Sequence, residues 1–527
     1  MTTTSLTARA PALMSSDEAD DAAFRELLLA DPRLAPVLSD AARFRAQVLL
    51  TEVVETSGAG TEACPHSRHT RLRRHAFRAD AEYFYPASTV KLFGAIAACV
   101  ALRELACAHP GLDKDTPLAF GVAPRGDDVP NETEHEATAK NTHSTSSRDV
   151  TTLRAELAKL FLVSDNRAFN RCFDLCGPSG IRRWTARHVP GEDVRVTHRL
   201  FDDAGEAKQS EARGAELPEV WARLPNDANA RDDGWVRVLE RRRDECRFEE
   251  EGSPSSFAKG VSASKRRDSR DYRVGSSVRR TREGDVEVVA GGLDCVAKNR
   301  CSLRALQRAA LVLARPDLVH LDTPHHEDGL TVERGKDDDI TISSTVSSLH
   351  PDDRECILLC AAAAPRDAAA CGVTDAADVR NAEAKPDEYN AFFLPGIQRA
   401  LRERVKESRS NDPSVSHVDT YRPVVTNKLG RAYGFSVDNA HVRVDVVRSV
   451  DPNGEKRKKI DDDDDDDERA SLRFREFFLA VAVETNENGV VNDDAYEYEA
   501  VADPFLEAVA EVAAKFAWDP KRRERGE

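Results

Sequence analysis

The sequence predicts an α/β (α+β) protein of two lobes, with an antiparallel sheet built from both chain ends, flanked by helices, and a mostly helical lobe inserted between them. Two observations predict this arrangement. Strand-like runs lie near both ends of the chain, at residues 44–55 and within residues 427–485. Between them, apolar residues recur at the spacing of helices.

The N-terminal part of the chain predicts two helices and two strands. Apolar residues recur at helical spacing over residues 24–38, and the run FRAQVLLTEVVE (44–55) changes from a helix end into a strand. Residues 82–85 form a short aromatic strand. Residues 92–105 are apolar on almost every side, which is typical of a helix buried inside the protein.

Two more helices are predicted in the middle of the chain, at residues 153–176 and at residues 293–314, the latter entered through the cap-like sequence Asn-Arg-Cys-Ser. Near the C-terminus, NKLGRAYGFSVD (427–438), HVRVDVV (441–447) and FREFFLAVAVET (474–485) predict three strands. A closing helix is expected from Asp503-Pro504 to about Trp518, since proline favours the first helical position.

These elements are expected to form one domain over residues 24–520. Polar, low-complexity insertions are expected at about residues 125–149, 202–285, 365–417 and 451–470. Residues 1–23 are expected to be a disordered or targeting-like extension, and residues 521–527 a charged tail. The seven aspartates from Asp461 to Asp467 fit a solvated loop better than a calcium site, because like charges in series repel.

The composition excludes some functions. A net charge of −17 disfavours nucleic-acid binding, and the basic stretch at residues 265–282 fits a disordered loop better than a nucleic-acid patch. No run approaches the length of a membrane span, and the N-terminus lacks the apolar core of a secretory signal. A cytoplasmic or organellar location is expected, and eleven cysteines without a C-x-x-C pair favour a reduced compartment. The sequence does not predict an oligomeric state.

Neither a metal nor an organic cofactor is expected. Cys64, His66, His69 and His75 have spacings that zinc can use, but they lie in a polar, arginine-rich segment without a second cluster of ligands. The run from His325 to Asp328 lacks helical H-E-x-x-H spacing and fits a solvated loop.

The strongest chemical signal is the Ser-x-x-Lys pattern at Ser88 and Lys91. A serine hydroxyl becomes a nucleophile when a neighbouring base accepts its proton, and residues three apart on a helix are neighbours. A helix that begins at Ser88 would also place free N–H groups at the nucleophile. The same pattern at Ser256 and Ser262 lies in a basic insertion without an apolar helix, so we interpret those two as accidents of composition.

Two further motifs follow in order. Ser164-Asp165-Asn166 is the only S-D-N in the chain, and Lys428 and Gly430 form K-x-G near a C-terminal strand. Taken alone, S-D-N is more typical of a helix cap and a turn. The order S-x-x-K, S-D-N, K-x-G matches the signature of serine β-lactamases and penicillin-binding proteins.

With these motifs, the chain resembles the class A β-lactamase-related serine hydrolases of the β-lactamase and penicillin-binding protein superfamily. The resemblance covers residues 40–122, 150–201, 286–320 and 420–518. It implies a β-lactamase-like two-lobed fold and a covalent acyl-enzyme at Ser88. The implied partner is a small amide or β-lactam-like substrate.

The resemblance also implies a role for each motif residue. Lys91 would accept the proton of Ser88, and Ser164 would relay a proton to the leaving nitrogen. Lys428 would place positive charge near a substrate carboxylate, and the backbone N–H groups of Ser88 and Arg431 would form the oxyanion hole. Three further residues complete the site: Asn166 would contact the substrate amide, Asp165 would organise its loop, and Gly430 would let substrate approach the strand.

Two departures from the family pattern stand out. Leu429 replaces the threonine or serine whose hydroxyl normally holds a substrate carboxylate, and Arg431 is one candidate to substitute for it. No E-x-x-L-N loop supplies the glutamate that activates water for deacylation, and the sequence does not choose among Glu206, Glu211, Glu216 and Glu219. A D-alanyl-D-alanine-type peptidase or esterase on the same scaffold, and an inactive binding or scaffold protein, therefore stay open as alternatives.

Overall fold

The computed structural model describes residues 16–57, 68–121, 150–200, 215–244, 271–275, 278–280, 286–288, 292–322, 349–386, 389, 391–411, 419–448, 474–491, 493 and 495–524. In these ranges no helix is long and apolar enough to cross a membrane.

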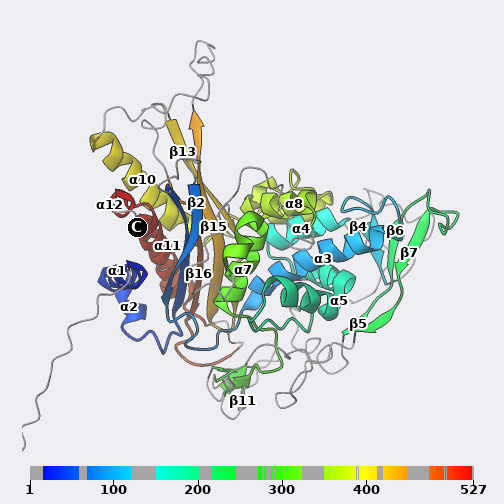
Figure 1. Ribbon diagram of the computed structural model, residues 1–527. Helices are drawn as coiled ribbons and strands as arrows, with labels where there is room; N and C mark the ends of the chain where they lie inside the picture. The colour runs from blue at the N-terminus through cyan, green and yellow to red at the C-terminus, as the bar shows by residue number, and fades with distance from the viewer. Residues whose placement is uncertain are drawn as a thin grey trace, which may run out of the picture.

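A single antiparallel sheet forms the centre of the molecule (Figure 1). Its strands are, in order across the sheet, β13 (Asp419–Asn427), β15 (Phe435–Arg448), β16 (Phe477–Glu484), β1 (Gln47–Ser57) and β2 (Arg68–Phe77). The short strand β14 (Gly430–Ala432) also pairs with β15, so β13 and β14 are two parts of the same edge. Strands from both chain ends thus lie side by side, as β1 pairs with β16 over six residues.

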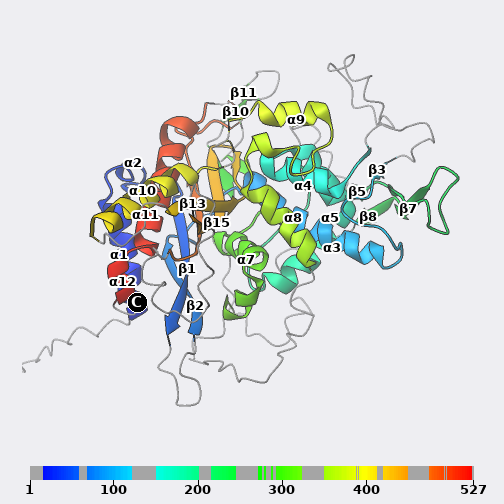
Figure 2. The same cartoon turned by 90° about the horizontal axis from the view of Figure 1, so that it is seen from above.

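One face of the sheet is covered by helices from the two chain termini. They are α1 (Ser16–Ala30), α2 (Ala35–Leu38), α10 (Leu394–Asn411), α11 (Asp503–Ala517), with the π-helical turn Tyr498–Ala502 before it, and α12 (Pro520–Glu524). Apolar side chains of these helices and of the sheet form one core cluster, which includes Phe24, Leu479 and Phe505. The view from above shows the same layering (Figure 2).

The helical lobe packs against the other face of the sheet. It contains the turn η1 (Ala87–Val90) and the helices α3 (Lys91–Ala106), α4 (Leu153–Leu162), α5 (Asn166–His188), α7 (Leu303–Ala314), η2 (Pro316–Asp322), α8 (Pro351–Ala362), η3 (Pro365–Asp367) and α9 (Ala376–Glu383). Helix α7 lies directly on β15 and β16, and the second core cluster fills the space between this lobe and the sheet.

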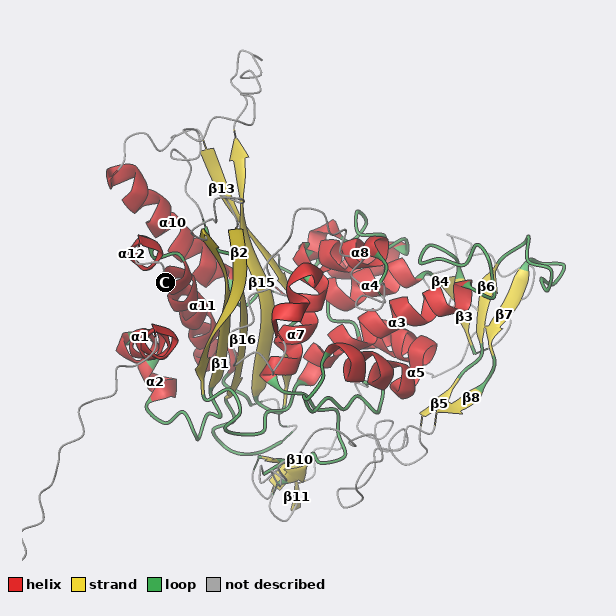
Figure 3. Ribbon diagram, in the orientation of Figure 1, coloured by secondary structure: helices red, strands yellow, loops and turns green. Residues whose placement is uncertain are grey.

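Small sheets lie at the periphery, several of them at the far end of the helical lobe (Figure 3). They are built from β3 (Leu118–Phe120), β4 (Val150–Thr151), β5 (Ala215–Leu217), β6 (Val220–Arg223), β7 (Trp235–Leu239), β8 (Arg242–Asp244), β9 (Arg273–Val274), β10 (Val278–Arg280), β11 (Val286–Val288) and β12 (Leu293–Asp294).

The predicted fold class is confirmed: an antiparallel sheet from both chain ends carries helices on one face and a helical lobe on the other. The buried helix expected at residues 92–105 is present as α3, and the closing helix is present as α11. Ser302 caps α7 through its side chain, which accepts from the N–H of Ala305 (3.0 Å), as the cap-like sequence indicated.

Several boundaries were predicted wrongly in the N-terminal part. Helix α1 begins at Ser16, inside the expected extension, and the predicted helix 24–38 is interrupted at Asp31-Pro32 because proline cannot continue the hydrogen bonding. Residues 82–85 belong to no strand in the described part of the chain. Strand β2 is paired with β1 along its whole length. It was missed because its many arginines and histidines give the sequence no pattern of alternating apolar residues.

Helix and strand boundaries also differ farther along. The stretch 153–176 is broken between Leu162 and Asn166, and residues 293–302 precede α7 instead of forming its first turns. The segment 427–438 is not one strand: it contains the end of β13, all of β14 and the start of β15, since the chain reverses at Tyr433-Gly434.

Two of the predicted polar insertions contain regular structure. Strands β5 to β10 lie within residues 202–285, and η3, α9 and α10 lie within residues 365–417. Helix α12 occupies part of the predicted charged tail. The expected insertions at 125–149 and 451–470, including Asp461 to Asp467, lie outside the described residues.

Candidate active site

Ser88 and Lys91 lie where the 3₁₀ turn η1 continues directly into α3. With three residues per 3₁₀ turn, residues three apart face the same side, so Ser88 and Lys91 align. Lys91 is fully buried, whereas Ser88 is half-buried. Ala87, directly before the serine, has a φ of +49°, a conformation that costs a non-glycine residue free energy and that tends to occur at functional sites.

Ser164 lies in the break between α4 and α5. Its φ is +55°, and this left-handed residue ends α4 and redirects the chain. Asp165 then caps α5, because its side chain accepts a hydrogen bond from the N–H of Ala168 (2.7 Å). Asn166 is the first residue of α5 and is half-buried.

Two buried lysines converge on Ser164. The Lys428 Nζ donates to Ser164 Oγ at 2.9 Å, and the Lys91 Nζ donates to the same oxygen at 3.2 Å. Lys91 also donates to the backbone carbonyl of Ser164, and Lys428 donates to the carbonyl of Leu429 (2.7 Å). One hydroxyl therefore joins the side-chain nitrogens of a lysine from α3 and of a lysine from the sheet edge.

Gly430 brings the sheet edge against the serine turn. A Cβ atom at Gly430 would lie 2.5 Å from the backbone N of Ser88 and 2.8 Å from that of Thr89. Only glycine permits this approach. The close contact at Gly430 is thus made by the chain's own η1 turn, whereas the sequence suggested a role in admitting substrate.

The register of the edge fixes the direction of the Arg431 N–H. Tyr433 and Gly434, both with positive φ, form a two-residue hairpin turn, and Ala432 faces Phe435 directly across it. Successive residues alternate in pointing toward or away from the partner strand, so Arg431 points its N–H away from β15. The N–H of Ser88 belongs to a first helical turn, where N–H groups have no partner within the helix.

Burial alters the charge of the site. It lowers the pKa of Lys428 to about 7, against the opposing charge of Asp438. Burial likewise raises the pKa of Asp438 to about 7, although the Asn427 amide donates to both of its oxygens (3.0 and 3.1 Å) and the Asn439 N–H to one (2.8 Å). Lys428 and Asp438 both titrate near neutral pH.

Sequence reasoning missed Asn427 and Asp438. Asp438 is completely buried, and it acts on the site through Lys428 and Asn427. The signal that was available is a single carboxylate in the strand-like run FSVDNAHV, a few residues after the K-x-G motif.

The side chain of Arg431 is engaged elsewhere. Its guanidinium pairs with Asp503, donates to Ser436 Oγ (3.3 Å) and lies 4.1 Å from the ring centre of Phe392. The suggestion that it replaces the hydroxyl missing at Leu429 is therefore not supported, because a substrate carboxylate would have to compete with Asp503.

Two of the four candidate glutamates lie far from this cluster. Glu216 is in β5 and pairs weakly with Arg241 (3.9 Å), and Glu219, just after β5, accepts from Trp221 (3.2 Å). Strands β5 and β6, on either side of Glu219, lie at the far end of the helical lobe (Figure 1). Glu206, Glu211 and the Ser-x-x-Lys patterns at Ser256 and Ser262 lie outside the described residues.

Of the histidines singled out from the sequence, the structure describes the contacts of His75. His75 is buried in β2 and contacts Glu52 (3.0 Å), His69 lies at the start of β2, and Cys64, His66 and residues 325–328 lie outside the described residues. Across the ranges that the structure describes, no group of three or more His, Cys, Asp or Glu side chains could hold a metal ion.

Comparison with known proteins finds similarity in solved structures alone. A β-lactamase from Desulfarculus baarsii DSM 2075 is 14% identical, with a TM-score of 0.35 over 94% of this chain and 97% of that one. PBP-A is 10% identical, with a TM-score of 0.32 over 96% of each chain. A β-lactamase from Xanthomonas campestris pv. campestris str. ATCC 33913 is 12% identical, with a TM-score of 0.31 over 95% of this chain and 98% of that one. Similarity at this level assigns neither a family nor an activity, and no protein-family model and no curated protein matches the chain.

Proposed function

We propose that this protein is a serine hydrolase that opens an amide bond, such as that of a β-lactam, through an acyl-enzyme at Ser88. The observation that carries the proposal is the convergence of Lys91 and Lys428 on the Ser164 hydroxyl. Lys91 in turn lies one helical turn after Ser88. The three motifs are separated by more than 70 residues at each step, and two lysines buried around one hydroxyl have an energetic cost that a purely structural role does not explain.

In the proposed acylation, Lys91 accepts the proton of Ser88 as the serine oxygen bonds to the substrate carbonyl carbon. The N–H groups of Ser88 and Arg431 stabilise the oxyanion that forms. The C–N bond then breaks, and Ser164 passes a proton to the leaving nitrogen, replenished from the lysines that donate to it. Asn166 is proposed to hold the substrate amide and Asp165 to fix the loop as the N-cap of α5.

A slow second step is the alternative that a specific observation favours. Of the four candidate glutamates, the structure describes Glu216 and Glu219, and both lie at the periphery of the helical lobe, away from Ser88. Glu206 and Glu211 lie outside the described residues, so the alternative rests on the two that are described. An acyl-enzyme without a water-activating carboxylate would persist, as expected for a peptidase-type acylating protein. We therefore propose fast acylation and slow deacylation.

The nucleophile is tested by covalent labelling. A fluorescent penicillin and a fluorophosphonate should label the wild-type protein and the Ser410→Ala control, whose serine is exposed on α10 in the other layer. Neither probe should label Ser88→Ala. Equal labelling of Ser88→Ala would overturn the assignment, and a folded wild-type protein that no probe labels would favour an inactive binding protein.

The rate of deacylation separates the two enzymatic alternatives. After stoichiometric labelling by the penicillin, the adduct should persist for many minutes, as followed by intact-protein mass spectrometry. Rapid loss of the adduct together with rapid turnover of nitrocefin would establish a lactamase and contradict the slow second step.

A further inference from the structure

We propose that Cys360 and Cys371 are a redox-active thiol pair, which hydrogen peroxide or a related peroxide converts into a disulfide. The bridge would tie the end of α8 to the turn between η3 and α9. Both thiols are free in the structure, as is a third thiol beside them, Cys356. The proposed hydrolase reaction uses none of these side chains, so this proposal is independent of it.

The three thiols meet where α8 packs against that turn. Cys356 and Cys360 are four residues apart in α8, so both lie on the same face of the helix. Both are buried, as is Cys371. Cys360 lies between the other two thiols and forms a side-chain hydrogen bond with each of them. Cys360 therefore has a sulfur atom on either side with which it could form a bridge.

Contacts of the surrounding residues hold the turn against α8. The Cys371 N–H donates to the carbonyl of Asp367 in η3 (2.9 Å). Arg154 of α4 contacts both segments: its guanidinium donates to Cys356 Sγ (3.8 Å), and its Cδ would lie 2.5 Å from a Cβ atom at Gly372. The position of Cys371 beside α8 is thus fixed by more than its own thiol.

Helix geometry selects Cys371 as the partner of Cys360. The Cβ atoms of residues four apart on a helix are about 5–6 Å apart. A disulfide needs a Cβ–Cβ distance of about 4 Å, so a bridge between Cys356 and Cys360 would require α8 to unwind locally. Cys371 lies on a separate segment after η3, and a bridge to it leaves the helix intact.

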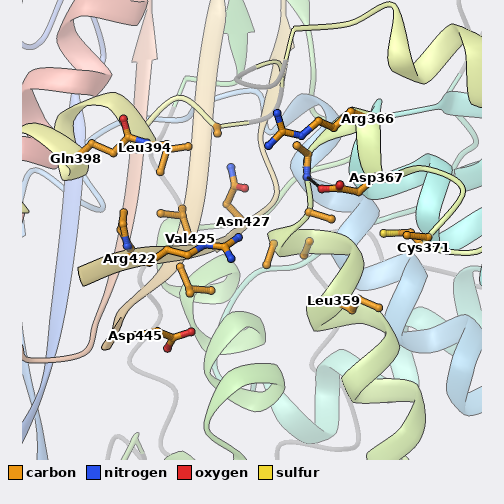
Figure 4. A pocket seen from close by; sticks show the side chains of 18 residues that line it. Leu359, Arg366, Asp367, Cys371, Leu394, Gln398, Arg422, Val425, Asn427 and Asp445 are labelled. Carbon is orange, nitrogen blue, oxygen red and sulfur yellow. Dashed lines mark hydrogen bonds between the residues drawn. The ribbon is translucent and has the colours of Figure 1, made fainter. Parts of the chain in front are cut away.

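A pocket gives the oxidant a route to Cys371. This pocket has a volume of about 620 Å³, and its walls come from α8, the turn after η3, α10 and β13. Figure 4 shows Cys371 and Leu359 of α8 among the side chains that line it. Hydrogen peroxide is little larger than water and fits such a space easily. Cys360 does not line the pocket, so Cys371 meets the oxidant first and Cys360 is the second, resolving thiol.

The surroundings of Cys371 also favour its reactive form. The hydrogen bond with Cys360 lowers the pKa of Cys371, although burial opposes this effect. A hydrogen bond with Cys360 and the charge of Arg154 lower the pKa of Cys356 in the same way. The thiolate is the form of cysteine that reacts with peroxides, and sensor cysteines are typically placed beside a resolving cysteine.

The reaction balances with the peroxide as the two-electron acceptor. The Cys371 thiolate attacks one oxygen of hydrogen peroxide, the O–O bond breaks, and the hydroxide that leaves takes up the thiol proton to form water. The Cys360 sulfur then attacks the sulfenic sulfur of Cys371. The S–S bond forms, the S–O bond breaks, and this hydroxide leaves with the proton of Cys360 as a second water. A dithiol reductant such as dithiothreitol reverses the oxidation.

Peptide mapping of the full-length protein tests the pair. The reduced protein is treated with hydrogen peroxide at neutral pH, the remaining thiols are alkylated under denaturing conditions, and tryptic peptides are analysed by mass spectrometry. Trypsin cleaves after arginine, so Cys360 and Cys371 fall in separate peptides, 355–366 and 367–380. We expect these two peptides to be joined by a disulfide at Cys360, and dithiothreitol to separate them.

The chain supplies its own controls. Cys172 and Cys176 are also buried and four residues apart, in α5, and they share one tryptic peptide. Burial raises the pKa of each of them. One pKa unit changes the thiolate fraction about tenfold, so Cys371 should be oxidised at least about tenfold faster than either. Cys107, which is exposed, reports that the peroxide has acted.

Three variants assign the bridge. Cys360→Ala and Cys371→Ala should each abolish it, whereas Cys356→Ala should retain it. A bridge within peptide 355–366, or a cluster that stays reduced while Cys107 is oxidised, would overturn the proposal. Thermal melting checks that the variants fold, and if one does not, the mapping of the wild-type protein decides by itself.

Discussion

Burial gives Lys428 a chemistry that its residue type does not reveal. An exposed lysine stays charged far above neutral pH, but burial lowers the pKa of this one to about 7. The ammonium group is therefore protonated below about pH 7 and largely neutral above it. If Lys428 provides positive charge for an anionic substrate, binding that depends on this charge must weaken as the pH rises through 7.

This dependence predicts different pH profiles for a charged and a neutral probe. Between about pH 6 and pH 8 the protonated fraction of a group with a pKa near 7 falls roughly tenfold. The rate of labelling by an anionic fluorescent penicillin, divided by the rate for an uncharged fluorophosphonate, should fall by about that factor. The ratio removes effects common to both reactions, such as titration of the base. A constant ratio would show that the charge of Lys428 does not act on the substrate.

At the residue scale, the sequence predicted which side chains form the site but not the charged group that is buried beside them. Ser88, Lys91, Ser164 and Lys428 were chosen from motif order, and the structure brings three of them into direct contact and places the fourth one turn away. Asp438 was not chosen, because the single carboxylate of FSVDNAHV gains its importance from complete burial beside Lys428, which follows from strand pairing between distant segments.

At the scale of elements, two residues with positive φ, each at the end of a helix, shape the site. Ala87 and Ser164 both adopt positive φ, one before α3 and one between α4 and α5. A pattern of apolar residues locates a helix but carries little information about such a break, because the left-handed conformation is imposed by the surrounding packing. The prediction of continuous helix across residues 153–176 failed for this reason.

A pair of alanine-to-glycine substitutions tests the strain at Ala87. Ala95→Gly, in the buried interior of α3, should lower the free energy of unfolding by about 1 kcal/mol or more. Ala87→Gly should change it by less than about 0.5 kcal/mol, since relief of the left-handed conformation offsets the lost methyl burial. Urea denaturation monitored by circular dichroism measures both, and equal losses would show that Ala87 is not strained.

The elements that were missed share a physical cause. Strand β2 and helices α8 and α10 carry many charged residues, yet each is held by tertiary contacts, such as the buried contact between His75 and Glu52. Composition alone therefore overestimated how much of the chain lies in polar insertions. The strongly apolar elements α3, β16 and α11 were found because an element buried on nearly every side consists of an almost continuous run of apolar residues.

At the scale of the whole molecule, the two chain ends are joined by a buried ion pair. Arg522 of α12 donates to both oxygens of Glu52 on β1 (3.1 and 3.0 Å), and both side chains are almost completely buried. His75 and Arg475 also contact the Glu52 carboxylate (3.0 and 3.3 Å). The last helix, α12, is thus held by this ion pair to β1, the first strand along the chain.

Removing Arg522 should therefore destabilise the whole sheet. Arg522→Ala leaves Glu52 buried with fewer partners and should lower the free energy of unfolding by about 3 kcal/mol at neutral pH. Lys521→Ala, one residue earlier and exposed, should change it by less than about 0.5 kcal/mol. Urea unfolding of the two variants measures the difference, and similar small losses would show that α12 does not hold the sheet.

The pH dependence of that difference identifies its electrostatic origin. Burial opposes ionisation of Glu52, but its contacts with His75 and Arg522 outweigh burial, and the pKa of this carboxyl is lowered from its usual 4.5. A group with a lowered folded-state pKa contributes stability that is complete above its unfolded-state pKa and is lost as the pH falls. The gap between wild type and Arg522→Ala should therefore narrow as the pH falls below about 4.5. A gap that stays constant would assign the loss to the packing of Arg522 on Phe516 (3.6 Å to the ring centre) instead of to its charge.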